Sequence, residues 1–107
     1  MAKFLLLFHG GGAMPQTEAE SAKILKAWED WYTSLGKAVV DPGNPFTMVA
    51  KKVTSKGTIG NGPAGTMASG YTILEAESLD IAARMAQGCP VLQSGGKISV
   101  FETFNVM

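Results

Sequence analysis

The residues best able to move a proton are few, and one of them stands at the start of the chain. His9 ends an apolar run at residues 4–8 and is followed by three glycines, giving FLLLFHGGG. Lipases and esterases use an HGGG segment beside a G-x-S-x-G nucleophile elbow. The nearest match is Ser69 followed directly by Gly70, with Met67 two residues before it, so the elbow is missing. His9 is therefore a candidate catalytic acid or base, because histidine exchanges protons readily near neutral pH.

Two glycine-rich segments resemble phosphate-binding loops. Residues 60–65 read GNGPAG, a literal G-x-G-x-x-G, with Asp80 where a dinucleotide site needs an acid. Such a site also needs a helix directly after the glycines, whereas residues 67–75 have the pattern of a strand. The GGK at residues 95–97 is followed by Ile98 instead of the serine or threonine of a P-loop. Hairpin glycines explain both segments better, and no cofactor is expected.

Composition excludes several classes of partner and site. The chain has 107 residues, 46% of them hydrophobic, with nine basic and nine acidic residues and no run of like charge. That balance predicts neither nucleic acid nor an acidic membrane surface as a partner. Cys89 is the single cysteine, so an internal disulfide and a zinc set are not expected, and a cytoplasmic location is the default. The apolar run before His9 is too short for a targeting or membrane-spanning segment.

A first helix, at residues 17–35, is predicted to carry most of the aromatic surface. Thr17 can cap it and Glu20 can complete a capping box, while Gly36 is placed for a left-handed cap at its end. An apolar stripe follows at three- and four-residue spacing: Ser21, Ile24, Leu25, Trp28, Trp31, Tyr32 and Leu35. Aromatic residues of a stripe usually pack in the core, but a ligand can also lie against them.

The remaining elements follow from turn residues and periodicity. Strands are expected at residues 46–53, 67–75 and 97–104, with a long turn at residues 55–65 and a bulge or close approach at Ser69 and Gly70. Two prolines and a glycine at residues 41–45 interrupt the entry to the second strand. Ser78 caps a second helix that ends at Gly88, and its expected buried side is Leu79, Ala82, Ala83 and Ala86.

The order strand, helix, strand, strand, helix, strand predicts one α+β domain over residues 1–107 with a ferredoxin-like βαββαβ plan. Right-handed crossovers place both helices on one face of a four-stranded antiparallel sheet of order 4-1-3-2. His9 is then expected near the loop at residues 61–65, Ser69 and Lys97, whereas Asp41 enters from the opposite edge. The bare face carries apolar residues such as Phe101, so we predict a homodimer through the sheet face.

Taken together, these segments resemble the YCII-related family of small dimeric α+β barrel proteins, also named for a DGPF motif. The similarity covers FLLLFHGG, LGKAVVDPGNPF, SGYTILEAESLDIA and GCPVLQSGGKISVFETF. It implies a dimer in which two sheets face each other. Asn61-Gly62-Pro63-Ala64 replaces DGPF here, and the first helix lacks the histidine of the His–Asp pair attributed to better-studied relatives, so that pair is not carried over.

Three hypotheses for function follow from the sequence. The leading one is a small-molecule lyase or isomerase-like enzyme that uses His9 as acid or base. The alternative is a non-catalytic ligand-binding or regulatory module in which His9 only anchors the glycine loop, and a purely structural partner is the third. No metal is expected. The candidate ligand-binding residues are Trp28, Asp41, Asn44, Asn61, Ser69 and Tyr71.

Overall fold

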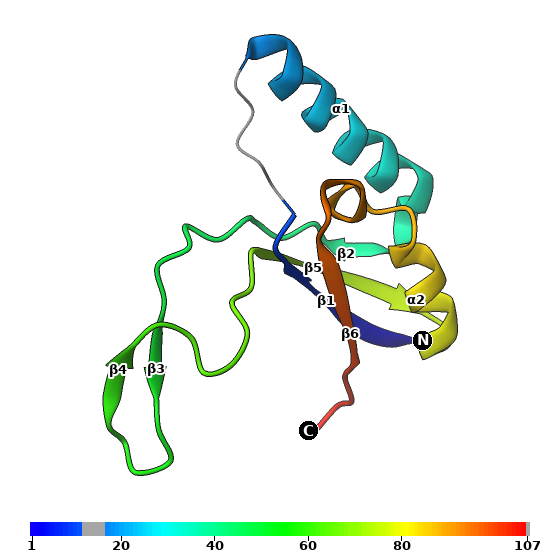
Figure 1. Ribbon diagram of the computed structural model, residues 1–107. Helices are drawn as coiled ribbons and strands as arrows, with labels where there is room; N and C mark the ends of the chain where they lie inside the picture. The colour runs from blue at the N-terminus through cyan, green and yellow to red at the C-terminus, as the bar shows by residue number, and fades with distance from the viewer. Residues whose placement is uncertain (12–16, 107) are drawn as a thin grey trace.

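The computed structural model describes residues 1–11 and 17–106 and has an α+β architecture (Figure 1). A four-stranded sheet carries two helices, and a separate two-stranded hairpin projects from it. The elements are β1 (Ala2–His9), α1 (Glu18–Leu35), the 3-10 turn η1 (Gly36–Ala38), β2 (Val39–Asp41), β3 (Lys51–Val53), β4 (Ile59–Asn61), β5 (Gly70–Ala76), α2 (Leu79–Ala86), the 3-10 turn η2 (Pro90–Ser94) and β6 (Lys97–Glu102).

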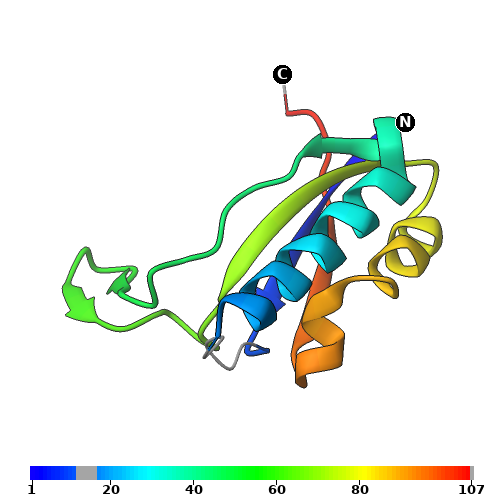
Figure 2. The same cartoon turned by 90° about the horizontal axis from the view of Figure 1, so that it is seen from above.

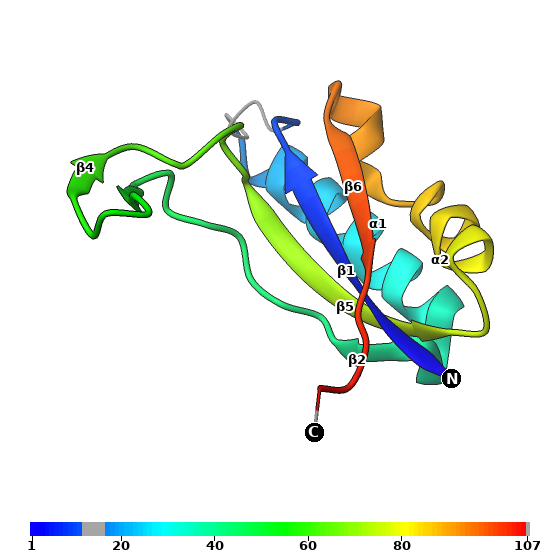
Figure 3. The ribbon, with the colours of Figure 1, turned by 90° about the horizontal axis from the view of Figure 1, so that it is seen from below.

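The main sheet has the order β2-β5-β1-β6, and all of its neighbouring strands are antiparallel. This is the predicted order 4-1-3-2, with β1 in the centre. Both helices lie on one face of the sheet, and the strands of the other face are uncovered in this chain (Figures 2 and 3). We call the uncovered side the open face.

Strand alternation divides the central strand between the two faces. Phe4, Leu6 and Phe8 are buried on the helix side, whereas Leu5 and Leu7 alternate with them and belong to the open face. On β5, the neighbouring strand, every second residue from Gly70 to Ala76 is buried in the same way. The core therefore occupies a single layer between the sheet and the helices.

The predicted second strand at residues 46–53 is correct only in part: residues 51–53 form β3, which pairs with β4 and not with β5. The strand that pairs with β5 is β2, three residues at the edge, with a register shift between Val39 and Asp41. Asp41 accepts a hydrogen bond from the backbone N–H of Gly43 at 2.8 Å and turns the chain away from the sheet. Pro45 then makes only an isolated bridge with Gly70. The prolines thus end the strand where it was expected to begin.

Residues 46–69 form an arm that leaves the sheet and returns to it (Figure 1). The arm contains β3 and β4, so the expected long turn at residues 55–65 is wrong in part: it includes the second strand of a hairpin. The radius of gyration is 15.3 Å, compared with about 13 Å for a compact domain of this length. The arm accounts for this difference because it lies outside the core.

Helix α1 begins as predicted and is buried less than predicted. The Thr17 hydroxyl accepts a hydrogen bond from the N–H of Glu20 at 3.0 Å. Gly36 ends the helix with φ +57° and ψ −123°, which is not the left-handed cap that was expected. Of the predicted stripe, Trp31 is buried, but Ile24 and Leu25 are 43% and 61% exposed. The amino-terminal half of α1 therefore extends beyond the core.

Helix α2 is also capped as predicted, by Ser78, whose hydroxyl accepts a hydrogen bond from the N–H of Ile81 at 3.2 Å. Ala82 and Ala86 are buried, and Ile81 and Met85 pack at the edge of the core. Leu79 and Ala83, which were expected inside, are exposed because the helix presents the 81–82–85–86 side to the sheet.

The glycines after His9 have two different roles in the part of the segment that the structure describes. Gly10 and Gly11 have φ of +68° and +65°, values that a glycine adopts without strain. A Cβ on Gly11 would also lie 2.7 Å from the carbonyl oxygen of Val91, so this glycine permits close backbone packing. Gly12 and the expected helix entry at Pro15 lie outside the described residues.

Candidate functional site

A cavity of about 440 Å³ lies between α1, the carboxyl end of β1 and the turn that follows β2. Most of the described lining is apolar or aromatic, and none of the described lining residues is charged. The lining residues are Phe8, Gly11, Leu25, Trp28, Tyr32, Pro42, Gly43, Asn44, Pro45, Ser69, Gly70, Tyr71 and Val91. The cavity therefore brings together four of the predicted ligand-binding residues: Trp28, Asn44, Ser69 and Tyr71.

Trp28 forms the aromatic centre of this cavity. Its ring meets Phe8 edge-on, with ring centroids 5.4 Å apart, and it lies 5.9 Å from the ring of Tyr32. Trp31, three residues further along the helix, is buried and donates its indole N–H to the carbonyl oxygen of Met85 at 3.0 Å. The two predicted roles of the tryptophans are thus divided: Trp31 is a core residue, whereas Trp28 packs on the core and also lines the cavity.

The turn after β2 forms one wall of the cavity and is held by side chains on both sides. The carbonyl oxygen of Pro42 accepts hydrogen bonds from the hydroxyls of Tyr32 and Thr72, both at 2.9 Å. The Asp41 carboxylate accepts the N–H of Gly43 from the other side. Asp41 does not line the cavity. It is a positioning residue for the turn.

Tyr32 is held as a neutral phenol. Burial raises its pKa above the ordinary value, a hydrogen bond with Thr72 opposes this, and the neighbouring Cys89 and Asp41 raise the pKa further. The hydroxyl hydrogen is therefore retained over the physiological range and remains available to the Pro42 carbonyl. Tyr32 stabilises the wall through its bond to Pro42 and also lines the cavity.

Ser69 and Asn44 supply the polar side chains of the lining. The Ser69 hydroxyl donates to the carbonyl oxygen of Gly10 at 3.0 Å, and the Ser69 N–H donates to the carbonyl oxygen of Phe8 at 2.6 Å. The expected close approach at Ser69 and Gly70 is present, since a Cβ on Gly70 would lie 3.2 Å from the Asn44 carbonyl oxygen. A hydroxyl and an amide therefore border an otherwise apolar space.

His9 does not line the cavity, although it directly follows Phe8, which does. Consecutive residues of a strand point to opposite faces, so the His9 ring belongs to the open face. Its Nδ1 lies 3.2 Å from the carbonyl oxygen of Met67, and its Nε2 lies 2.9 Å from the Ser99 hydroxyl. A carbonyl oxygen only accepts, so in the neutral ring Nδ1 carries the hydrogen and Nε2 accepts from Ser99.

The neighbours predicted for His9 are found in part. Lys97 is its register partner on β6, and Ser69 is bonded to the residues on either side of it. Asn61 lies in β4, in the arm, where its side chain accepts a hydrogen bond from Lys51 at 3.0 Å. Asn61 is not part of the cavity.

Sequence reasoning missed Ser99 and, apart from Asn44, the wall formed by residues 42–45. Ser99 is flanked by Ile98 and Val100, which pack against the core, so strand alternation alone places it on the open face with Lys97. Pairing β6 with β1 would then have placed Ser99 near His9. The turn had no comparable signal, because its position depends on hydrogen bonds from Tyr32 and Thr72, which are distant in the sequence.

Other reactive chemistry is limited in the described residues. Cys89 is 1% exposed, and burial raises the pKa of its thiol to about 11, so it remains an unreactive neutral thiol. Across residues 1–11 and 17–106, histidine, cysteine and carboxylate side chains form no cluster of three or more that could hold a metal ion. Within the same residues, neither helix has the length and apolar character needed to cross a membrane.

Comparison with known proteins gives no independent identification. A scan of the chain against protein-family models finds no match, and a search of curated proteins finds none either. The similarity to the YCII-related family is therefore a prediction from motifs, and function has to be argued from the geometry above.

Proposed function

We propose that this protein binds a small, neutral, largely aromatic molecule in the cavity between α1 and the sheet. The observation that carries the proposal is the lining: among the residues that the structure describes, it consists of aromatic and aliphatic side chains with Asn44 and Ser69 at its border and no charged residue. Small-molecule sites are typically concave, mostly apolar and supplied with a few polar groups that fix orientation. The volume, about 440 Å³, also lies in the usual range for such sites.

The lining also indicates the chemistry of the ligand. Trp28, Tyr32 and Tyr71 line the cavity, and aromatic side chains pack well against a planar molecule. The ring of Tyr71 is also stacked on Phe46, with ring centroids 6.0 Å apart. The exposed Asn44 can donate to a carbonyl or accept from a hydroxyl at the border of the cavity. An ionised ligand would lose water without gaining a countercharge, which is costly. A hydroxylated or carbonyl-bearing aromatic compound fits these requirements best.

Acid–base catalysis by His9 is the second candidate function, and one observation favours it. The ring is oriented by Met67 and contacts a hydroxyl, the arrangement in which a histidine can take up and return a proton. Because His9 and the cavity lie on opposite faces of the sheet, a lyase or isomerase-like reaction at His9 would act on a molecule at the open face. A ligand in the cavity lies on the other face from His9, so the cavity fits a binding or regulatory function.

We also propose a ferredoxin-like fold, kinship with the YCII-related family and a homodimer formed through the open face. The strand order and the placement of both helices on one face support the fold. Leu5, Leu7, Ile73 and Phe101 support the dimer, because they make the open face apolar and a second copy would cover them. In such a dimer, His9 would be enclosed between two sheets.

A ligand screen with two variants tests the binding proposal. Neutral hydroxylated or carbonyl-bearing aromatic compounds are expected to raise the melting temperature and to quench Trp28 fluorescence. Trp28→Ala should weaken binding of such a compound at least tenfold, while His9→Ala, on the other face, should leave it unchanged. If no neutral aromatic compound bound, or if Trp28→Ala had no effect, the cavity would not be the site. Loss of binding in His9→Ala alone would favour the open face.

A further inference from the structure

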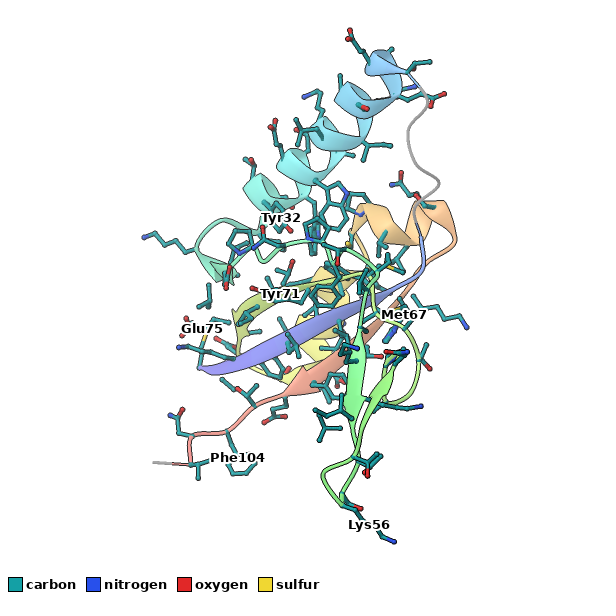
Figure 4. All side chains as sticks on the ribbon, turned by 90° about the vertical axis from the view of Figure 1, so that its left-hand side faces the viewer. Tyr32, Lys56, Met67, Tyr71, Glu75 and Phe104 are labelled. Atoms are coloured by element: carbon teal, nitrogen blue, oxygen red, sulfur yellow. The ribbon has the colours of Figure 1, made fainter. Side chains whose placement is uncertain are left out.

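We infer that the arm, residues 46–69, is an interaction element that contacts the body of a second copy of this chain. The inference rests on the pairing of open faces proposed above and adds to it a second contact surface. The arm projects from the sheet on the side opposite the helices, so it borders the open face (Figures 1 and 4). In Figure 4, Lys56 at its tip and Phe104 in the carboxyl-terminal segment both lie on the side of the sheet away from α1.

The arm exposes apolar side chains that its own chain does not cover. Val53 and Ile59 are paired across the hairpin and are 65% and 66% exposed, and Val49 is 84% exposed. A two-stranded hairpin alone in water is at best marginally stable. Aliphatic residues on such a hairpin are best explained by a surface that covers them.

The base of the arm offers a recess for that contact. The segments of the arm before β3 and after β4 border a cleft of about 250 Å³, lined by residues that include Phe46, Met48, Pro63 and Met67. Met48 is the one described residue other than glycine with a positive φ, +72°. The cleft is apolar and separate from the cavity beside α1, so it suits a side chain of a partner rather than the proposed ligand.

The distribution of charge favours a second copy as the partner. The arm carries Lys51, Lys52 and Lys56 and no acidic residue, whereas the chain as a whole has formal net charge zero. The rest of the chain therefore carries three more acidic than basic residues. Two arms repel each other, while an arm and the body of another copy attract. In a twofold dimer each arm meets the other body, which makes the surface self-complementary.

The exposed area is sufficient for such a contact. The chain exposes 7753 Å², whereas a compact monomer of this mass exposes about 5,700 Å². The excess, about 2,000 Å², is larger than the roughly 800 Å² that each partner contributes to a standard interface.

Sedimentation of the full chain and three variants tests the inference. Val53→Asp/Ile59→Asp is expected to raise the dimer dissociation constant at least tenfold, and Phe101→Asp should do the same through the open face. Ile24→Asp is the matched control, because Ile24 is 43% exposed on α1 and faces neither surface. It should leave the dimer unchanged. Far-UV circular dichroism and urea unfolding check that each variant folds.

The outcomes separate the two proposals. An unchanged dimer in the arm variant, with dissociation caused by Phe101→Asp, would overturn the role of the arm and leave the open-face pairing standing. A wild-type chain that is monomeric up to 100 μM would overturn both. Hydrogen exchange on the wild type tests the inference without any variant. Amides of the arm should become more protected as protein concentration rises. Equal exchange at all concentrations would contradict the inference.

Discussion

Replacement of Gly43 by alanine tests whether the turn after β2 is held in place by its fit against β5. Gly43 has φ +69°, and a Cβ built on it would overlap the carbonyl oxygen of Tyr71 and lie 3.1 Å from Cδ2 of the Tyr71 ring. The overlapping atom belongs to the backbone of β5, so rotation of a side chain cannot remove the clash. The turn would have to move away from the sheet.

Two contributions set the expected size of the effect. An alanine with positive φ costs about 1 kcal/mol relative to glycine. Displacement of the turn would also weaken the hydrogen bonds from Tyr32 and Thr72 to Pro42, each worth about 1 kcal/mol. We therefore expect Gly43→Ala to lower the free energy of unfolding by about 3 kcal/mol.

Gly10→Ala is the matched control for this change. Gly10 has φ +68°, and a Cβ there would meet nothing within 4 Å. Gly10→Ala has the same cost of a positive φ and the same effect on the unfolded chain as Gly43→Ala. We therefore expect it to lower the free energy of unfolding by about 1 kcal/mol. Urea unfolding followed by circular dichroism measures both variants, and ligand binding should weaken only in Gly43→Ala. Equal losses of stability in the two variants would refute the proposed fit.

Two further predictions concern the helices and the core. Thr17→Ala should lower the free energy of unfolding by about 1 kcal/mol, because the N–H of Glu20 loses the Thr17 hydroxyl as an acceptor. Thermal unfolding of variants with equal helix content measures this loss, and Thr33→Ala, at an exposed position of α1, is the control. Burial raises the Cys89 pKa from 9.0 to about 11, so the neutral thiol stabilises the fold below pH 9 and this contribution falls as pH rises toward 11. Relative to Cys89→Ala, the wild type should lose about 2 kcal/mol by pH 10.5, and parallel pH profiles would contradict this.

Features set by a few adjacent residues were predictable from the sequence. Thr17 and Ser78 cap their helices because each hydroxyl reaches an N–H three residues further on. The central position of β1 followed from an apolar run that needs cover on both sides. Strand order followed from the handedness of the crossovers, which depends on the order of elements and not on their exact limits.

The second strand was mispredicted because its position depends on contacts distant in the sequence. Residues 46–53 have the pattern of an extended segment, but Asp41 and Pro42 direct the chain off the sheet through bonds with Gly43, Tyr32 and Thr72. Once the segment leaves the edge of the sheet, it can pair only with itself. The arm and the position of the turn at residues 42–45 share this cause, so neither was predicted, although Asn44 was named as a ligand-binding candidate.

The separation of the two candidate sites follows from the period of a single strand. Phe8 contributes to the cavity on the helix side, and His9, the next residue, bonds Ser99 on the open face. A shift of β1 by one residue would exchange these positions and would also place Leu5 and Leu7 in the core. The buried row of Phe4, Leu6 and Phe8 sets the register against such a shift. The packing of β1 thus places the cavity beside Trp28 and the ring of His9 on opposite sides of the sheet.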